Sequence, residues 1–419
     1  MHVVIIGGGV GGLCLAQGLK RSGVSVAVYE RDASPHIRDQ GWRISLKEAG
    51  SGALRDCLPA ALFDLCVATA IRPATRMAFT DHRLTPKFAK PIPPQPGDVF
   101  FGVNRLTLRE ILLTGLDDVR HFDRTFVSYD HTGDGRVRAH FADGTTAIAD
   151  LLVGADGTGS AVRHSLVPGA VIDGIGGFVY GRTPITPDLL DTVPEVLVDS
   201  FNRVTAPGGA AMSVATCRAR LSPSTAAAAH APQARLTDIP DYFAWTVSGG
   251  EGWPPAGGGS PHDRPPHDRS PHDRSHHGGS RGGDFRDMDA SALHRLALDT
   301  IGGFHPSARR IVEHADIPAT FPVRLRSARP VPRWETTNVT LLGDAIHTMS
   351  PGRGEGANVA LRDAALLRRA ITEAAAGAPL DETIRGYETE MLRYGFAAVE
   401  ASLTQPFAPP RRTFTPPVS

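Results

Sequence analysis

A run of glycines close to the N-terminus has the spacing of a loop that binds a dinucleotide. Residues 7–12, with the sequence GGGVGG, fit the pattern G-x-G-x-x-G. In this pattern Gly7 permits a tight turn, Gly9 lets the backbone approach a pyrophosphate, and Gly12 lets a helix pack closely on a strand. Glu30 follows Gly12 by 18 residues and is placed to accept hydrogen bonds from a ribose diol. An acid at this position disfavours a ribose with a 2′-phosphate.

Two further strand ends carry an aspartate beside a glycine. A predicted strand over 150–154 is followed by Asp156, an arrangement that by itself is also typical of an ordinary turn. A second predicted strand runs into Asp344, whose carboxylate can accept a hydrogen bond from a ribityl or ribose hydroxyl. A glycine-containing turn over 351–358 then leads into a long helix. The N–H groups at the start of that helix favour negative charge in the same crevice.

A βαβ unit must hold the glycine loop. Residues 2–6 are short, apolar and β-branched, which predicts a buried parallel strand. Residues 11–21 then predict a helix, and residues 25–29 a second strand that ends at Glu30. We also predict helices over 104–116 and 356–374, strands over 150–154 and 337–342, and a hairpin over 125–141.

Length and composition exclude several classes of protein. The chain has 419 residues, and at roughly 100–200 residues per domain this predicts two or three domains. Lys+Arg and Asp+Glu are both 44, and a net charge of zero disfavours nucleic acid or an anionic membrane as the main partner. No stretch approaches about 18 consecutive apolar residues, so no membrane span is predicted. Cys14, Cys57, Cys66 and Cys217 are too scattered for a disulfide framework, which fits a cytoplasmic protein.

Residues 248–283 hold much of the glycine and proline of the chain. They contain three copies of Pro-His-Asp-Arg and almost no apolar side chains, which predicts a disordered loop. Histidines at a period of five in a flexible chain define no ligand geometry, so an expanded surface loop is favoured over metal capture and no metal site is predicted. The proline-rich tail after Gln405 is also predicted to be loose. The histidines are His262, His267, His272, His276 and His277.

The order of these motifs resembles that of the single-component FAD monooxygenases with the para-hydroxybenzoate hydroxylase fold. The glycine loop, the Asp-Gly near 156 and the Gly-Asp near 344 follow one another as in that family. Residues 104–112, NRLTLREIL, are similar to the family's helix whose second arginine reaches FAD. The tetracycline-inactivating monooxygenases are similar in this helix and over 343–358. The resemblance covers most of the chain apart from 248–283 and the tail, and is specific to fold and cofactor rather than to substrate.

The resemblance implies an α/β fold, with a Rossmann-like FAD-binding domain, an inserted β-sheet substrate domain and a C-terminal helix. Residues 176–247 and 285–321 are expected to form the sheet that roofs the flavin. The predicted domains are the FAD-binding domain over 1–70, 96–175 and 322–376, the substrate domain over 71–95 and 176–321, including the loop 248–283, and a C-terminal helix with a loose tail over 377–419.

The resemblance also implies contacts to FAD but no side-chain nucleophile, because the chemistry is centred on the flavin. His347 has the type of a general base, yet its place directly after the Gly-Asp turn favours a structural hydrogen bond. Glu355 stands where relatives often carry glutamine, and a carboxylate there would slightly disfavour the reduced flavin anion. The implied contacts are Gly7, Gly9 and Gly12 to the pyrophosphate, Glu30 to the adenosine ribose, Arg31 and Arg43 on the adenine or ribityl side, Arg109 to FAD, Asp156 and Gly157 to FAD and the nicotinamide cofactor, Gly343 and Asp344 to the ribityl–pyrophosphate stem, and Pro351, Gly354, Gly356, Ala357 and Asn358 beside the isoalloxazine ring.

The implied reaction consumes NAD(P)H and O2 and proceeds through a flavin C4a-hydroperoxide. It hydroxylates or epoxidises an aromatic or polyketide-like small molecule, as in secondary metabolism, and the enzyme is expected to be a monomer or homodimer. Tyr180 and Arg182 are candidate substrate contacts, although a strand face with a solvated neighbour also explains them. The helix that begins near Gly356 is expected to stabilise negative charge on the reduced flavin.

Other functions are compatible with the same scaffold. A flavin-dependent halogenase usually shows a Trp-x-Trp-x-Ile-Pro run, which this sequence lacks. An FAD-dependent reductase of isoprenoid double bonds stays open, and NAD(P)H oxidation without O2 uptake would support it. A non-catalytic binding protein of this fold need not keep residues that contact FAD, so the presence of Arg109, Asp156 and Asp344 favours an enzyme.

Overall fold

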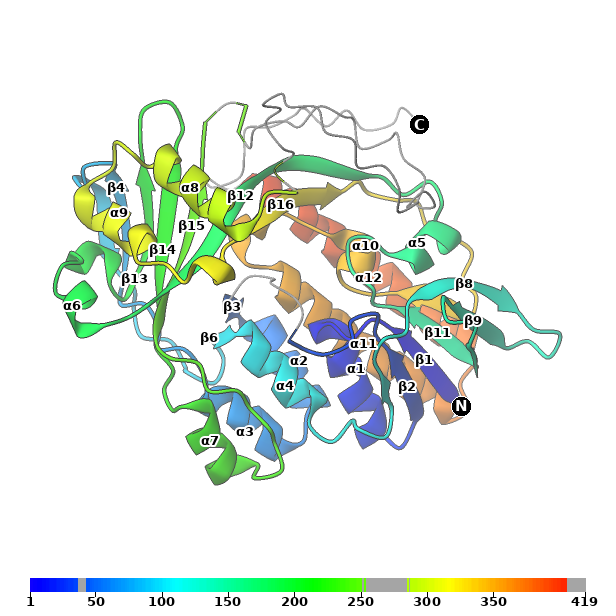
Figure 1. Ribbon diagram of the computed structural model, residues 1–419. Coiled ribbons are helices and arrows are strands. Elements are labelled where there is room, and N and C mark those ends of the chain that lie inside the picture. The colour runs from blue at the N-terminus through cyan, green and yellow to red at the C-terminus, as the bar shows by residue number, and fades with distance from the viewer. Residues whose placement is uncertain (37–42, 251, 254–284, 286, 405–419) are drawn as a thin grey trace.

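The computed structural model describes residues 1–36, 43–250, 252–253, 285 and 287–404. Figure 1 shows a parallel sheet with its helices in one half of the molecule and a larger, mostly antiparallel sheet in the other. We call these the cofactor half and the sheet half. The repeats at 261–274, the other histidines of that segment and the tail after Gln405 lie outside the described residues, so the predictions of a disordered loop, metal capture and a loose tail stay predictions.

The cofactor half is built on a five-stranded parallel sheet with the order β17-β11-β1-β2-β7. Its central strand is fully apolar after His2, and Val3, Val4 and Ile5 have no exposed surface, as expected for a parallel strand covered on both faces. The strands are β1 (His2–Ile6), β2 (Ser25–Tyr29), β7 (Arg120–His121), β11 (Leu151–Gly154) and β17 (Val339–Leu341).

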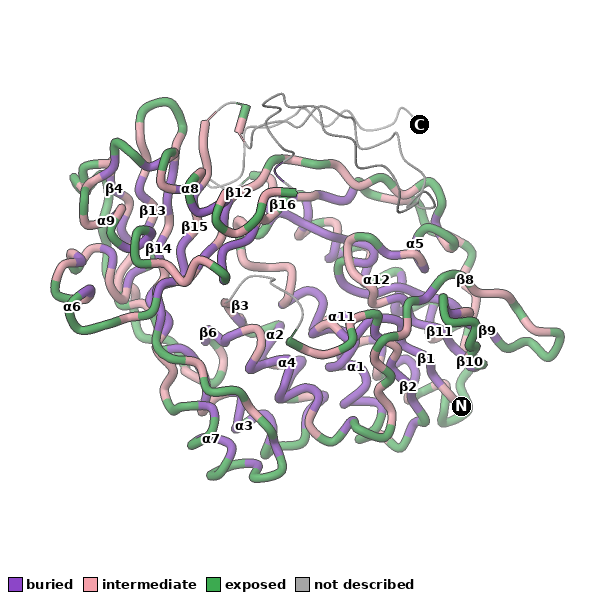
Figure 2. Tube along the Cα trace, viewed as in Figure 1, coloured by how far each residue is buried: buried purple, intermediate pink, exposed green. Residues whose placement is uncertain are grey.

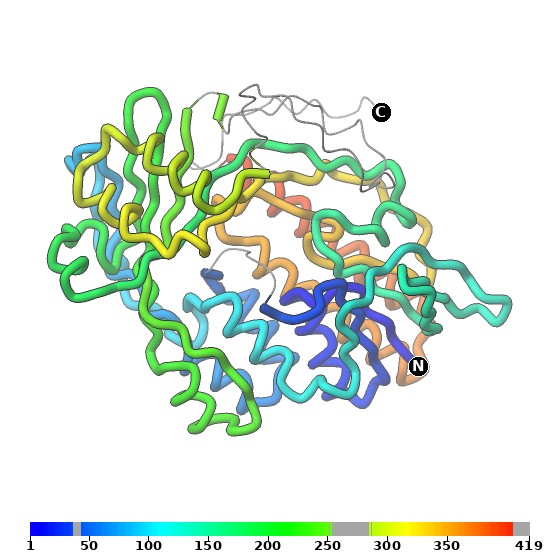
Figure 3. The backbone as a smooth tube through the Cα atoms, viewed as in Figure 1, coloured from blue at the N-terminus to red at the C-terminus, as the bar shows by residue number. Residues whose placement is uncertain are grey.

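Helices from both ends of the chain pack together beside this sheet. Figure 3 shows the blue N-terminal segment next to the orange segment that follows residue 340, and α1 contacts α11 directly. A three-stranded antiparallel sheet packs against β1 and β11. The elements are α1 (Val10–Arg21), α2 (Glu48–Cys57), α3 (Ala60–Ala68), α4 (Arg105–Leu113), α5 (Ala161–Leu166), α10 (Asp344–His347), α11 (Gly356–Ala375), α12 (Leu380–Leu403), β8 (Phe126–His131), β9 (Val137–Phe141) and β10 (Thr146–Ala149).

The sheet half is a seven-stranded sheet whose two faces differ. Because successive side chains of a strand point to opposite faces, Val179, Phe243 and Trp245 lie on one face, where they are buried against α8 and α9. Figure 2 shows β14 and β15 with mostly buried residues. We call the opposite face, which carries Tyr180 and Tyr242, the inner face. The order is β16 (Phe321–Ala328), β12 (Ile172–Pro184), β15 (Tyr242–Ser248), β14 (Ala211–Cys217), β13 (Ser200–Thr205), β4 (Arg76–Asp81) and β5 (Pro86–Pro91), with α8 (Ala290–Thr300) and α9 (Pro306–Glu313) outside.

The structure differs from the sequence prediction in the middle of the chain. Residues 285–321 do not form the sheet but supply α8 and α9, which cover its outer face. The predicted boundary at 322 divides β16, although β16 pairs with β12 along its length. The helix α7 (Pro223–His230), expected in the substrate domain, joins the core of the cofactor half, because its small alanines pack closely against α3.

Short elements complete the described chain. A two-stranded ribbon of β3 (Arg43–Leu46) and β6 (Phe101–Asn104) lies between the two halves in Figure 1. No helix in the described residues combines the length and the apolar character needed to cross a membrane. The same residues contain no group of three side chains suited to hold a metal ion. The remaining helices are α6 (Pro187–Leu190) and the single turns η1 (Glu195–Leu197), η2 (Ile317–Ala319) and η3 (Pro351–Arg353).

Candidate FAD site

The glycine loop between β1 and α1 requires glycine for different reasons at each position. Gly7 has a φ of +115°, and a Cβ there would lie 2.3 Å from the carbonyl oxygen of Ala155. A Cβ on Gly12 would lie 2.2 Å from the carbonyl oxygen of Gly7, so the helix cannot approach the strand this closely with any other residue. A Cβ on Gly9 would meet no protein atom within 4 Å. Gly9 therefore faces open space, where the pattern expects a pyrophosphate.

A buried carboxylate and an arginine hold this loop. Glu30 is 3% exposed, and its Oε2 accepts a hydrogen bond from the Gly8 N–H at 2.7 Å. Arg109 of α4 donates from Nε to the Gly8 carbonyl at 3.1 Å and from Nη1 to the Pro35 carbonyl at 3.0 Å. Its Nη2 lies 3.7 Å from Glu30 and 3.6 Å from Asp32. Arg109, predicted to contact FAD, thus also positions the loop and the acid; Arg31 is exposed beside them.

Asp156 is engaged at the start of the short helix α5. Its Oδ1 accepts from the Ser160 hydroxyl at 2.5 Å, and its Oδ2 accepts from the Ala161 N–H at 2.8 Å. Burial raises the pKa of Asp156 against the effect of these hydrogen bonds. Gly157 follows with a φ of +77°. The side chain of Asp156 therefore stabilises the start of α5, in addition to any contact that it makes to a cofactor.

The Gly343–Asp344 turn is built over a buried carboxylate on α11. Gly343 has a φ of +62° and donates its N–H to Oδ2 of Asp363 at 2.7 Å. The same oxygen lies 2.7 Å from Nε2 of His347, and the Tyr394 hydroxyl donates to Oδ1 at 2.5 Å. Burial lowers the pKa of His347, but the carboxylate of Asp363 raises it by more. The pKa of His347 therefore lies above its usual value. His347 thus makes the structural hydrogen bond that its position predicts.

The side chain of Asp344 is exposed, although neighbouring protein atoms partly desolvate its carboxylate. Asp344 begins α10, which packs against α5 and α12 (Figure 1). Its residue surface is exposed, but the protein around it removes hydration and raises its pKa, while His347 and Arg105 favour the ionised form. The side chain therefore lies at the surface with protein atoms close around it. The carboxylate is thus available to a ligand.

The turn before α11 is tied to the ribbon strand β3. Gly354 has a φ of +64°, which favours glycine. Asn358 donates from Nδ2 to the carbonyls of Gly354 and Ser45, both at 2.8 Å. Its Oδ1 accepts from the Lys47 N–H at 2.8 Å. The side chain of Asn358 therefore fixes the shape of the turn that was predicted to flank the isoalloxazine ring.

Glu355 does not present an isolated carboxylate. It forms an ion pair with Lys47, whose Nζ also donates to the Arg353 carbonyl at 3.1 Å. The sequence-based expectation considered the carboxylate alone and did not include this ammonium group. The two charges offset one another, so Glu355 does not place an unbalanced negative charge in the turn.

These features fit the shape and charge of FAD. Neither α1 nor α11 has a side-chain cap at its start, so both leave N–H groups available to an anion. The two helix starts are close, because a Cβ on Gly11 would lie 3.3 Å from the Ala360 carbonyl of α11. The glycine loop and Asp344 lie at the same edge of the parallel sheet, since they follow the carboxyl ends of β1 and β17, the two neighbours of β11. The donors suit phosphates and a reduced flavin, and the carboxylates suit sugar hydroxyls.

The candidate substrate residues lie on β12 of the inner face. The Tyr180 ring packs edge-on against Phe321, with 5.5 Å between ring centres, and Phe178 lies 6.2 Å away. Arg182 donates from Nε and Nη2 to Asp316 at 3.0 and 2.8 Å. Tyr180 therefore belongs to an aromatic cluster, whereas Arg182 is engaged by a carboxylate of the chain.

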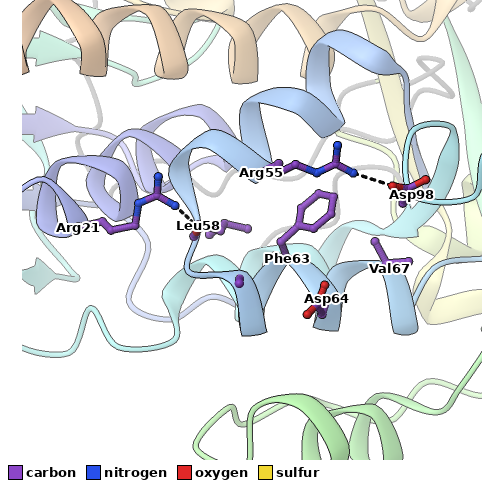
Figure 4. A pocket seen from close by; sticks show the side chains of 8 residues that line it. Arg21, Arg55, Leu58, Phe63, Asp64, Val67 and Asp98 are labelled. Atoms are coloured by element: carbon purple, nitrogen blue, oxygen red, sulfur yellow. Dashed lines mark hydrogen bonds and ion pairs between the residues drawn. The ribbon is translucent and has the colours of Figure 1, made fainter.

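A pocket of about 380 Å³ lies away from this site, beside α2 and α3 (Figure 4). Arg21 donates to the Leu58 carbonyl at 2.6 Å, and Arg55 pairs with Asp98 at 2.7 Å. Both arginines that line the pocket are thus engaged within the chain. We assign no cofactor to it.

Several residues that hold the site were given no role from the sequence. Arg163 of α5 donates to the Ala345 carbonyl at 2.7 Å and joins the Asp156 turn to α10. Lys47 and Asp363 hold the two turns described above. Asn104 caps α4 by accepting from the Leu106 N–H at 2.9 Å. A cap residue before an apolar helix was the one recognisable local signal among these.

Two family models match stretches that carry the site. The model described as an FAD binding domain matches residues 313–402, which include Asp344, Asp363 and α11. The model described as an NAD(P)-binding Rossmann-like domain matches residues 5–46, which include the glycine loop and Glu30.

Known proteins are similar over most of the chain. A solved structure from Photorhabdus luminescens subsp. laumondii, assigned as an FAD-containing monooxygenase, is 30% identical, covers 96% of both chains and has a TM-score of 0.74. HpxO of Klebsiella pneumoniae, solved with FAD and uric acid, shares the fold at 21% identity, with 96% of this chain and 87% of that chain covered and a TM-score of 0.71. The dual O-methyltransferase/FAD-dependent monooxygenase elcB of Phaeosphaeria nodorum is 34% identical over 90% of this chain. This chain spans 41% of the length of that relative.

The fold and the site together define a flavoprotein, with a Rossmann-type half that binds the dinucleotide and a sheet placed over it. More specifically, the chain belongs to the family of FAD-dependent monooxygenases that have the para-hydroxybenzoate hydroxylase fold. The resemblance drawn from the order of the motifs is thereby confirmed.

Proposed function

We propose that this chain is an FAD-dependent monooxygenase that uses NAD(P)H and O2 to hydroxylate or epoxidise an aromatic or polycyclic molecule of the polyketide type. The observation that supports this best is that the glycine loop, two uncapped helix starts and Asp344 meet at the carboxyl edge of the parallel sheet. FAD held there would supply the redox chemistry: NAD(P)H provides two electrons, one oxygen atom of O2 enters the substrate, and the other leaves as water.

Different residues of this site would bind different parts of the cofactor. The loop 7–12 and the start of α1 would bind the pyrophosphate, Glu30 the adenosine ribose, and Asp344 the ribityl chain. The turn 351–358 would lie beside the ring, and the start of α11 would favour negative charge on it. Within the described residues the loop 7–12 is our one candidate for a dinucleotide loop, so we propose that NAD(P)H binds transiently, near Asp156 and Gly157.

The inner face of the seven-stranded sheet would contact the substrate. Tyr180, in its cluster with Phe178 and Phe321, offers an aromatic surface suited to a flat ring. Hydroxylation of a ring produces a phenol, and an O-methyltransferase can consume a phenol. The two activities named together in the Phaeosphaeria relative therefore support a phenolic, polyketide-like substrate for this chain.

Oxygen uptake by the FAD-loaded protein tests this proposal. We expect NADH or NADPH to reduce the protein and a phenolic or polycyclic compound to stimulate O2 uptake. Asp344→Asn should lower FAD affinity, whereas Asp188→Asn, at an acid in the first turn of α6, should not. NAD(P)H oxidation with a reduced product and no O2 uptake would instead support a reductase, and a protein that binds no FAD would overturn the proposal.

A further inference from the structure

Arg43 carries a charge that no group of the described chain neutralises. It begins β3 and is half-buried, and its Nε is buried without a hydrogen-bond partner. No carboxylate within the described residues forms an ion pair with its guanidinium. A partly desolvated guanidinium without a partner is costly, so such an arrangement favours a ligand that supplies an anion.

The ribbon of β3 and β6 sets the direction of this side chain. Arg43 pairs directly with Asn104, and Ser45 pairs directly with Gly102. Residues directly opposite in an antiparallel pair lie on the same face, so these four share one face of the ribbon. A Cβ on Gly102 would lie 3.1 Å from Nε of Arg43, so the guanidinium lies flat over this glycine.

One end of this ribbon face touches the turn that precedes α11. The Ser45 carbonyl accepts from Asn358, and a Cβ on Gly354 would lie 3.9 Å from the Ser45 Cβ. Arg43 is two residues from Ser45, or about 7 Å along a strand. The guanidinium is therefore a neighbour of the proposed flavin ring site.

The other side of the same face meets the inner face of the seven-stranded sheet. Asn104 donates from Nδ2 to the Tyr242 hydroxyl at 2.9 Å. Ile71, which packs beside Gly102, clusters with Tyr242 and Cys217. Burial raises the pKa of the Cys217 thiol, and the charge of Arg43 acts in the opposite direction, so the two groups are close.

We propose that Arg43 binds an anionic oxygen of the substrate, such as a phenolate, an enolate or a carboxylate. Arg43 lies at the corner between the flavin turn and the aromatic inner face, which is where substrate and ring would meet. This inference rests on the proposed function, because it requires FAD at the proposed site. It names an acidic aromatic molecule as the class of substrate and Arg43 as a residue that determines specificity.

The position of Arg43 favours the substrate over the cofactor as the source of this anion. The pyrophosphate would have its donors at the glycine loop and the start of α1 in the cofactor half, whereas Asn104, the strand partner of Arg43, bonds Tyr242 of the sheet half. Arg43 instead lies near the cluster of Ile71, Cys217 and Tyr242, because Ile71 flanks the same Gly102, the charge of Arg43 acts on Cys217, and its strand partner Asn104 bonds Tyr242. In such surroundings a charge-assisted hydrogen bond to an aromatic anion is strong.

Binding of a matched pair of probes tests the assignment. We would titrate FAD-loaded protein with 2-naphthoate and with its neutral analogue 2-naphthamide, and follow the flavin absorbance. We expect the wild type to bind the carboxylate about tenfold more tightly or better. Arg43→Met should abolish this preference, Arg43→Lys should keep part of it, and Arg309→Met, at a surface arginine of α9, should change nothing. The FAD dissociation constant should stay within about twofold in all variants.

Each other outcome overturns the inference in a distinct way. A wild type without preference for the carboxylate, including one that binds neither probe, shows that Arg43 does not recognise a substrate anion. A tenfold loss of FAD affinity in both Arg43→Met and Arg43→Lys makes Arg43 a cofactor ligand. If the wild type binds no FAD, the proposed function fails instead. Arg43→Lys keeps the test informative if Arg43→Met does not fold.

Discussion

Replacing Asp363 by asparagine is expected to loosen the Gly343–Asp344 turn and weaken FAD binding. Asp363 accepts from Gly343 at 2.7 Å, lies 2.7 Å from His347 and accepts from Tyr394 at 2.5 Å. In Asp363→Asn the amide oxygen still accepts from Gly343 and His347, while the amide nitrogen donates to the tyrosine hydroxyl. The shape is kept and the charge is lost. A charge-assisted hydrogen bond contributes about 1 kcal/mol more than a neutral one, so the three bonds amount to about 3 kcal/mol.

Thermal unfolding and flavin fluorescence measure the two effects. With about 2.1 cal/mol/K per residue, a loss of about 3 kcal/mol lowers the Tm of 419 residues by about 3 °C. We expect the FAD dissociation constant to rise about tenfold, which corresponds to about 1.4 kcal/mol. Because the pKa of His347 is raised in the folded state, its pairing with Asp363 stabilises fully below about pH 6.5 and is lost as the pH rises through the raised value. The Tm difference between wild type and variant should therefore be larger at about pH 6 than at about pH 9.

Glu388 provides the matched control. Its buried carboxylate also accepts three hydrogen bonds, from Trp334 at 3.0 Å and from Thr336 and Thr340 at 2.6 and 2.9 Å. Glu388→Gln should lower the Tm similarly but leave FAD affinity unchanged. If Asp363→Asn binds FAD as the wild type does, or if Glu388→Gln weakens FAD equally, the reasoning about the turn is refuted.

The glycine loop and the turn before α11 give further predictions. Gly9→Ala should fold with an unchanged Tm but lose FAD, because its Cβ meets no protein atom within 4 Å. Gly12→Ala should lose both stability and FAD, because its Cβ lies 2.2 Å from the Gly7 carbonyl oxygen. Differential scanning fluorimetry and flavin release distinguish the two variants, and a flavin-loaded Gly9→Ala would contradict the placement of the pyrophosphate. Glu355→Gln leaves the charge of Lys47 unopposed and should raise the flavin midpoint potential, Lys47→Met should lower it, and the double variant should return close to wild type. Both single variants of the ion pair should change the free energy of unfolding by less than about 1 kcal/mol, since the pair is partly exposed. Equal midpoint potentials in all four proteins would show that the turn does not lie beside the ring.

Local patterns in the sequence predicted the parts of the fold whose residues carry their own signal. The strand over 2–6 and the strand over 25–29 were found with their observed bounds, because β-branched runs bounded by glycine or charge are distinctive. The helix predicted over 356–374 ends within one residue of α11. The helix predicted over 104–116 is shorter in the structure, where α4 ends at Leu113.

Long-range partners and packing were not predictable in the same way. Lys47 and Glu355 are 308 residues apart, and nothing near either residue indicates the other. The helices α8 and α9 had local signals, an Asp289 cap and a proline at the first position of α9, but the resemblance led to the expectation of a sheet over 285–321. The alanine-rich sequence of α7 does not indicate which half of the molecule the helix joins. Its place in the cofactor half is determined by its packing against α3.

Incorporation of oxygen from isotopically labelled O2 tests the central claim most directly. The FAD-loaded protein would be supplied with NAD(P)H and the phenolic or polycyclic compound that most stimulates O2 uptake, and the product would be analysed by mass spectrometry. We predict a product heavier by one labelled oxygen atom, formed in proportion to the NAD(P)H consumed. A product reduced by two hydrogens with no label, or oxygen in the product derived only from water, would contradict the account.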